Sequence, residues 1–187
     1  MTVHSIRRIQ TIPAPFDKVW SFFTDPAKLV LITPAYMQFK VLHPAEKPQV
    51  YAGQLIEYTL RPVLGIRLYW MTEITQVFPR SGPGASVTPE GSPASGANAE
   101  GANAFSAEEA YFVDESRRGP YSLWHHQHHF RSVPGGIEMT DIVHYEIPFG
   151  PLGNLAHALF VRRQLHGVFD YRFAKVEEIF GRYAPPA

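Results

Sequence analysis

The residue types best suited to chemistry gather in one short stretch of the chain, the segment 125–129, which reads HHQHH. On a β-strand, successive side chains point to opposite faces of the sheet. One face of this segment and its neighbours therefore carries Trp124, His126, His128 and Phe130, and the other carries His125, Gln127 and His129. Because the face with Trp and Phe is the more apolar, we expect His126 and His128 to point into the protein interior.

A carboxylate is expected close to these two imidazoles. The triplet Pro134-Gly135-Gly136 follows the histidine strand and is typical of a hairpin turn. If Pro134 and Gly135 form a two-residue turn, His128 lies opposite Asp141 on the returning strand. If Gly135 and Gly136 form the turn, Asp141 is diagonal to His128. Either register predicts that Asp141 lies near His128.

Four kinds of chemistry are open to this group. It can be a buried hydrogen-bonded network with only a structural role, or it can orient the polar end of a ligand in an apolar pocket. It can act in acid–base catalysis, with Asp141 orienting His126 or His128. A His-x-His pair can also chelate a metal ion, but a metal site needs a third inward ligand and the spacing names none. No metal and no cofactor are therefore expected.

The C-terminal part of the chain predicts one long helix over about 152–182, with an amphipathic stripe that faces the sheet. The stripe contains Leu155, Leu159, Arg162, His166, Phe169, Phe173, Val176 and Phe180. An unpaired charge on that face would be costly. Arg162 is therefore expected to pair with Asp141 or Asp114, to reach water, or to meet an anionic group of a ligand.

The elements that position these groups are read from hydrophobic periodicity. The order is a strand (3–12), two short helices (16–23 and a second one starting at Asp25-Pro26), six strands and the long helix. The six strands are expected at 36–43, 53–61, 67–78, 108–116, 121–132 and 137–147. This order predicts an α+β fold in which a curved, seven-stranded antiparallel sheet grips the long helix. The cavity between them should be apolar, with Tyr58, Trp70 and Trp124 in its lining.

Residues 81–104 differ from the rest of the chain, because they are mostly Gly, Ala, Pro and Ser. Such a stretch buries too little apolar surface to offset its ordering entropy. We expect a flexible insertion between the fourth and fifth strands of a single domain spanning 1–187.

Composition excludes several classes of function. Lys plus Arg and Asp plus Glu both number 17, so the net charge gives no reason to expect nucleic-acid binding. The absence of cysteine excludes disulfides, thiolate metal sites and a cysteine nucleophile. No apolar run is long enough for stable membrane insertion, and no signal peptide is recognised, so a cytoplasmic protein is expected.

Three passages resemble the START-like or SRPBCC superfamily: IPAPFDKVWSFFTDPAKL near the N-terminus, FVDESRRGPYSLWHHQHHF at 112–130, and MTDIVHYEIPFGPLGNLAHALFVRRQLHGVFDYR at 139–172. The last two are similar to a bacterial ligand-binding SRPBCC subgroup often labelled cell division inhibitor or cyclase/dehydrase-like. The resemblance implies a helix-grip fold with a binding cavity, and it implies no particular substrate. Some members of the subgroup are fused to an epimerase-like domain, which implies an epimerase-like protein as a possible partner.

The leading functional prediction is binding or transport of a hydrophobic small molecule, such as a lipid, a quinone or a polyketide-like compound. The predicted binding residues are Tyr58, Trp70, Trp124, His126, His128, Phe130, Asp141, Leu159, Arg162, His166 and Phe169. One alternative is a cyclase, dehydratase or lyase that uses His126 or His128 with Asp141. Another is a module that binds an epimerase-like or cell-division protein.

Overall fold

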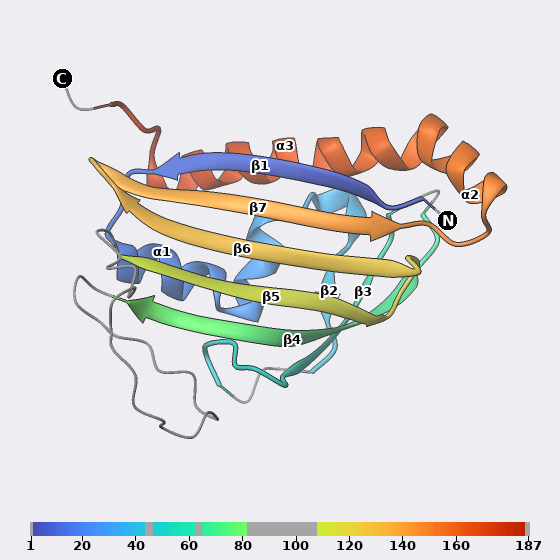
Figure 1. Ribbon diagram of the computed structural model, residues 1–187, viewed down its shortest axis with the longest axis horizontal. Helices are drawn as coiled ribbons and strands as arrows, with labels where there is room; N and C mark the ends of the chain where they lie inside the picture. Colours follow the sequence, from blue (N-terminus) through green and yellow to red (C-terminus); the bar gives the residue numbers. More distant parts are fainter. Residues whose placement is uncertain (1, 44–46, 63–64, 82–107, 186–187) are drawn as a thin grey trace, which may run out of the picture.

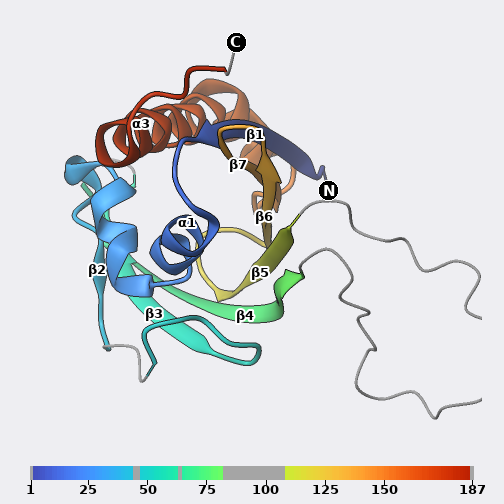
Figure 2. The same cartoon turned by 90° about the vertical axis from the view of Figure 1, so that its left-hand side faces the viewer.

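A computed structural model describes residues 2–43, 47–62, 65–81 and 108–185. In it, seven antiparallel strands form one sheet in the order β1-β7-β6-β5-β4-β3-β2. The strands are β1 (His4–Ile12), β2 (Lys40–Val41), β3 (Leu55–Leu60), β4 (Leu68–Ser81), β5 (Glu109–Arg118), β6 (Leu123–Val133) and β7 (Gly136–Glu146). Figure 1 shows the C-terminal helix lying along the sheet, next to β1. In the end view of Figure 2, the sheet curves around the short helix α1, and the C-terminal helix spans the opening between its edges. The predicted α+β architecture is confirmed.

Two short helices connect β1 to the far edge of the sheet. Helix α1 (Phe16–Phe23) buries Phe16, Val19 and Phe22 against the sheet. The 3-10 helix η1 (Pro26–Ile32) begins as the sequence indicates, because the Asp25 side chain accepts a hydrogen bond from the backbone N–H of Ala27 at 2.9 Å.

The strand predicted over 36–43 is wrong in most of its length. A second 3-10 turn, η2 (Ala35–Met37), occupies its first half, and β2 contains only Lys40 and Val41. The turn ends at Gln38, whose φ of +45° places it in the left-handed region and so interrupts an extended strand.

The β6–β7 hairpin fixes the register at the centre of the sheet. Val133 pairs with Gly136, so Pro134 and Gly135 form the turn and His128 lies directly opposite Asp141. Gly135 has a φ of +81°, which glycine adopts without a side-chain penalty. The first of the two registers considered from the sequence is therefore the one adopted.

The C-terminal helix contains a change of helical type that the sequence pattern did not predict. It starts as α2 (Pro151–Ala156), continues as a π-helical turn, η3 (His157–Val161), and ends as α3 (Arg162–Phe180). A π turn bonds each residue to the fifth one along and therefore rotates the faces on its two sides relative to each other. The predicted stripe holds at Phe169 and Val176, which are buried, but Leu155, Leu159 and Phe173 are exposed.

Residues 82–104 of the predicted insertion lie outside the described part of the chain, which resumes before β5. Among the described residues, none of the helices has both the length and the apolar character needed to cross a membrane.

Candidate functional site

A cavity of about 210 Å³ lies between the concave face of the sheet and α3. Its lining is mostly apolar and includes Leu29 and Ile32 from η1, Tyr58 from β3, Trp70 from β4, and Leu165 and Phe169 from α3. Polar side chains enter the lining at the middle of the sheet, from β5 and β6, and also around η1, where Asp25, Lys28 and Thr33 lie.

The two faces of the histidine strand are arranged as the alternation predicts. His126 and His128 are each only 6% exposed and line the cavity. His125, Gln127 and His129 are half-buried on the opposite face. There Gln127 contacts both neighbouring histidines at 3.0 Å, and His125 Nδ1 lies 2.8 Å from Glu115 Oε1.

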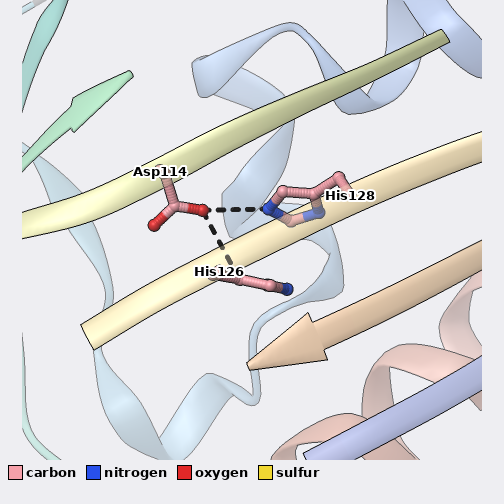
Figure 3. A group of neighbouring side chains, drawn as sticks. All are labelled: Asp114, His126 and His128. Carbon is pink, nitrogen blue, oxygen red and sulfur yellow. Dashed lines mark hydrogen bonds and ion pairs between the residues drawn. The ribbon is translucent and has the colours of Figure 1, made fainter. Parts of the chain in front are cut away.

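The two inward imidazoles stand between two carboxylates, one from each neighbouring strand (Figure 3 shows three of the four groups). Asp114 Oδ1 on β5 lies 2.9 Å from His128 Nε2 and 3.4 Å from His126 Nδ1. Asp141 Oδ1 on β7 lies 3.0 Å from His126 Nε2 and 3.0 Å from His128 Nδ1. We call these four residues the Asp-His cluster. The contact between Asp141 and His128 Nδ1 is short, but its angle does not satisfy a hydrogen bond.

The register of the three strands explains this geometry. Asp114 is paired across the sheet with His126, and Asp141 is paired with His128. Each imidazole therefore has one carboxylate directly opposite and the other on a diagonal, and both distances are within reach of side chains on one face.

Arg172 of α3 completes the cluster from above. Its guanidinium is 3.3 Å from Asp141 Oδ1, its side chain is 11% exposed, and it also lies over the ring of Phe23 at 5.2 Å. The residue lines the cavity together with Asp114, His126 and His128.

The protonation states of the cluster follow from burial and from its neighbours. Burial would raise the pKa of Asp141, but Arg172 and the two imidazoles hold that pKa well below its usual value. The pKa of Asp114 is also lowered, because contacts with both histidines outweigh its burial. Burial and the neighbouring His128 lower the pKa of His126, whereas the two carboxylates outweigh burial and raise the pKa of His128.

Several of the predicted binding residues lie outside this cavity, which corrects the sequence-based placement. Leu159 is 57% exposed in the π turn, and Phe130 is 1% exposed in the core beneath α1, where Trp20 packs edge-on at 5.4 Å. Arg162 and His166 line a separate polar pocket beside β1. Asp141 contacts the cluster from behind the two imidazoles and is absent from the cavity lining.

Arg172, not Arg162, pairs with the buried carboxylate. Arg162 is exposed, and His166 contacts Arg8 at 2.9 Å instead of facing the sheet. Both arginines lie in α3, and the residues of this helix that face the cavity follow the spacing Leu165, Phe169 and Arg172. That spacing of four and three residues is visible in the sequence, and it could have identified Arg172.

The comparisons with known proteins agree with this architecture. A sequence model of the family described as "Polyketide cyclase / dehydrase and lipid transport" matches residues 12–168. The chain belongs to this family. The matched region contains the whole Asp-His cluster and ends before Arg172. No curated protein matches the chain significantly.

Solved structures show the same fold at low sequence identity. The protein TTHA0849 from Thermus thermophilus is 15% identical with a TM-score of 0.57, over 94% of this chain and 95% of that one. A START superfamily protein from Mycobacterium smegmatis is 11% identical with a TM-score of 0.52, over 94% of this chain and 99% of that one. Ginseng major latex-like protein 151 from Panax ginseng is 11% identical with a TM-score of 0.53, over 95% of this chain and 97% of that one. These likenesses confirm the helix-grip fold of the START-like superfamily.

Proposed function

We propose that the protein binds a hydrophobic small molecule in the cavity between the sheet and α3. The observation that carries this proposal is the composition of the cavity: its lining is mostly apolar, and Asp114, His126, His128 and Arg172 form a compact polar group in it. Apolar walls with a few convergent polar groups are typical of small-molecule sites, because the walls supply affinity and the polar groups fix orientation. A lipid, a quinone or a polyketide-like compound has this combination of chemistry.

A polar end of the ligand would be held at the middle of the sheet. The Arg172 guanidinium offers N–H donors there, so an oxygen-bearing group fits this wall better than an amine. Trp70 adds a further reason, because its indole N–H is buried without a hydrogen-bond partner in the described part of the chain and its side chain lines the cavity. An acceptor on the ligand within reach of that N–H would satisfy it.

Native mass spectrometry of freshly purified protein tests whether a ligand is retained. In parallel, the neutral fluorescent probe N-phenyl-1-naphthylamine should bind wild-type protein in the cavity. Val168→Trp places a large ring in the lining and should abolish probe binding, whereas Leu159→Trp adds the same ring at an exposed position outside the cavity. Equal probe binding by both variants, with melting temperatures equal to wild type, would contradict the cavity as the binding site.

An enzyme of the cyclase, dehydratase or lyase type is the second candidate. The observation that favours it is the position of His126 and His128 on the cavity wall, with Asp141 behind both rings. A carboxylate behind an imidazole fixes the orientation of the ring, as a general base requires. Turnover of the co-purified molecule, lost in His128→Gln while binding persists, would establish catalysis. A ligand that is bound and never converted would restrict the function to binding.

A further inference from the structure

Three potential metal-ligand atoms converge on the cavity wall. Asp114, His126 and His128 each offer one potential ligand atom, and these three atoms all lie within 4.8 Å of one another. Asp114 Oδ1 is close to His128 Nε2 and to His126 Nδ1. Two of the separations are 2.9 Å and 3.4 Å. Ligands bonded to one ion at about 2.0–2.2 Å stand roughly 3.0–3.5 Å apart in tetrahedral or octahedral geometry. These two pairs are therefore already close to the spacing of a coordination site.

Both nitrogens of His126 and both nitrogens of His128 face carboxylate oxygens. Two of these contacts are hydrogen bonds, His126 Nε2 with Asp141 and His128 Nε2 with Asp114, so each ring needs only one N–H. A neutral His126 that donates from Nε2 keeps a lone pair on Nδ1 for a cation on the cavity side. At His128, the cation would replace the hydrogen bond between Nε2 and Asp114.

We propose that Asp114, His126 and His128 bind a divalent first-row transition metal ion, such as Zn²⁺ or Fe²⁺. Two imidazole nitrogens and one carboxylate oxygen are the donor set that these ions accept, and three protein ligands leave coordination positions open. All three residues line the cavity, so the open positions face the space in which a small molecule would lie. The strand alternation supplied the two histidines, and the register of β5 supplies the third ligand that the sequence spacing did not name.

The remaining members of the cluster support the rings from the opposite side. Asp141 Oδ1 lies 3.0 Å from His126 Nε2 and 3.0 Å from His128 Nδ1, the two nitrogens that point away from the proposed ion. Metal-binding imidazoles commonly donate their second N–H to a carboxylate, which fixes the tautomer and the ring orientation. Arg172 in turn neutralises Asp141. Asp141 and Arg172 are therefore positioning residues for the proposed site.

The protein also carries histidines that could bind metal elsewhere, so the experiment needs matched controls. His125 and His129 are on the same strand with their side chains on the outer face. Protein without an affinity tag, stripped with EDTA and then freed of it, should be titrated with Zn²⁺ by calorimetry. Co²⁺ should be titrated by visible absorption, which reports ligand number and geometry.

Wild type should bind one ion per chain. His126→Ala and Asp114→Asn should lose this binding, and Asp141→Asn should weaken it by about 10- to 100-fold. His125→Ala and His129→Ala should bind like wild type. Asp114→Asn keeps the shape of the side chain, so it tests the site even if His126→Ala does not fold, and circular dichroism checks both.

Absence of binding of Zn²⁺, Co²⁺, Mn²⁺ and Fe²⁺ to wild type would overturn the proposal. Unchanged binding in both His126→Ala and Asp114→Asn, or loss in either outer-face control, would do the same, because the ion would then lie elsewhere. The proposed ligand binding is measured separately: N-phenyl-1-naphthylamine binding to the EDTA-treated protein reports on the cavity without the ion.

Discussion

Replacing Arg172 tests the arrangement of the buried charges most directly. Arg172→Met keeps an unbranched apolar chain of similar length and removes only the guanidinium. Asp141 then loses the cation that lies 3.3 Å from its Oδ1 in a site where both side chains are about nine-tenths buried. Removing one partner of a buried ion pair costs about 3–5 kcal/mol, because the other charge is left uncompensated. We expect about 3 kcal/mol, the lower end of that range, because His126 and His128 still contact the same carboxylate.

Arg162→Met is the matched control, since it makes the same change ten residues earlier on the same helix. Arg162 is exposed and has no ion pair among those found in the described part of the chain. Surface changes of this kind alter stability by about 0.5 kcal/mol or less. The pair therefore separates the arginine that the structure places at the cluster from the one that the sequence pattern predicted there.

Equilibrium unfolding in urea measures both variants, and it should be done in the presence of a chelator so that metal binding does not contribute. The slope of the free energy against urea should be unchanged, with the loss appearing in the midpoint. For a domain of this size, a loss of about 3 kcal/mol corresponds to a melting temperature lower by roughly 6–12 °C. A loss below about 1 kcal/mol in Arg172→Met, or an equal loss in the two variants, would refute the reasoning.

Two glycines and one histidine give the remaining predictions. Gly136→Ala should destabilise the protein by about 1–3 kcal/mol in urea unfolding, because the new Cβ would lie 2.3 Å from the carbonyl oxygen of Ile12. Gly167→Ala should instead stabilise the protein by up to about 1 kcal/mol, because the position is helical and a Cβ there meets nothing within 4 Å. A loss of stability in urea unfolding would contradict this expectation. Burial and the nearby His4 and Arg162 lower the pKa of His157 in the folded protein. The stability that this group contributes is therefore present above the unfolded pKa of histidine and is lost as the pH falls toward the lower pKa of the folded state. NMR titration should show a higher His157 midpoint in Arg162→Met than in wild type, and an unchanged midpoint would exclude the Arg162 charge as a cause.

The elements that depend on local signals could be predicted from the sequence. Alternation along β6 places His126 and His128 inward because a strand has no freedom to turn single side chains to the other face. The Pro134-Gly135 turn then fixes the position of Asp141 by simple counting across the hairpin. Both inferences need only one strand or one tight turn.

The parts that failed depend on long-range geometry. The face that α3 turns to the cavity is set by packing against the rest of the fold, and it contains Arg172 and not Arg162. Asp114 was named only as a possible partner of Arg162, because β5 and β6 are joined by a loop whose length leaves their register undetermined. Its pairing with His126 requires the assembled sheet.

The position of the Asp-His cluster bears on whether stability alone explains it. The cluster lies on the middle strands of the sheet, next to buried apolar residues. The ring centroid of Phe112 lies 4.2 Å from that of His128, and the ring centroid of Phe169 lies 5.9 Å from that of His126. Apolar side chains of similar volume at such a place are often as stabilising as a buried ion network, or more so, because they avoid the cost of desolvating charges. Two carboxylates, two imidazoles and a guanidinium therefore offer no evident advantage as filling for a core. All of these groups except the Asp141 carboxylate line the cavity, and that carboxylate holds both rings in orientation from behind. This division between donors that face the cavity and a supporting group behind them fits a site that recognises an ion or a ligand better than it fits a scaffold.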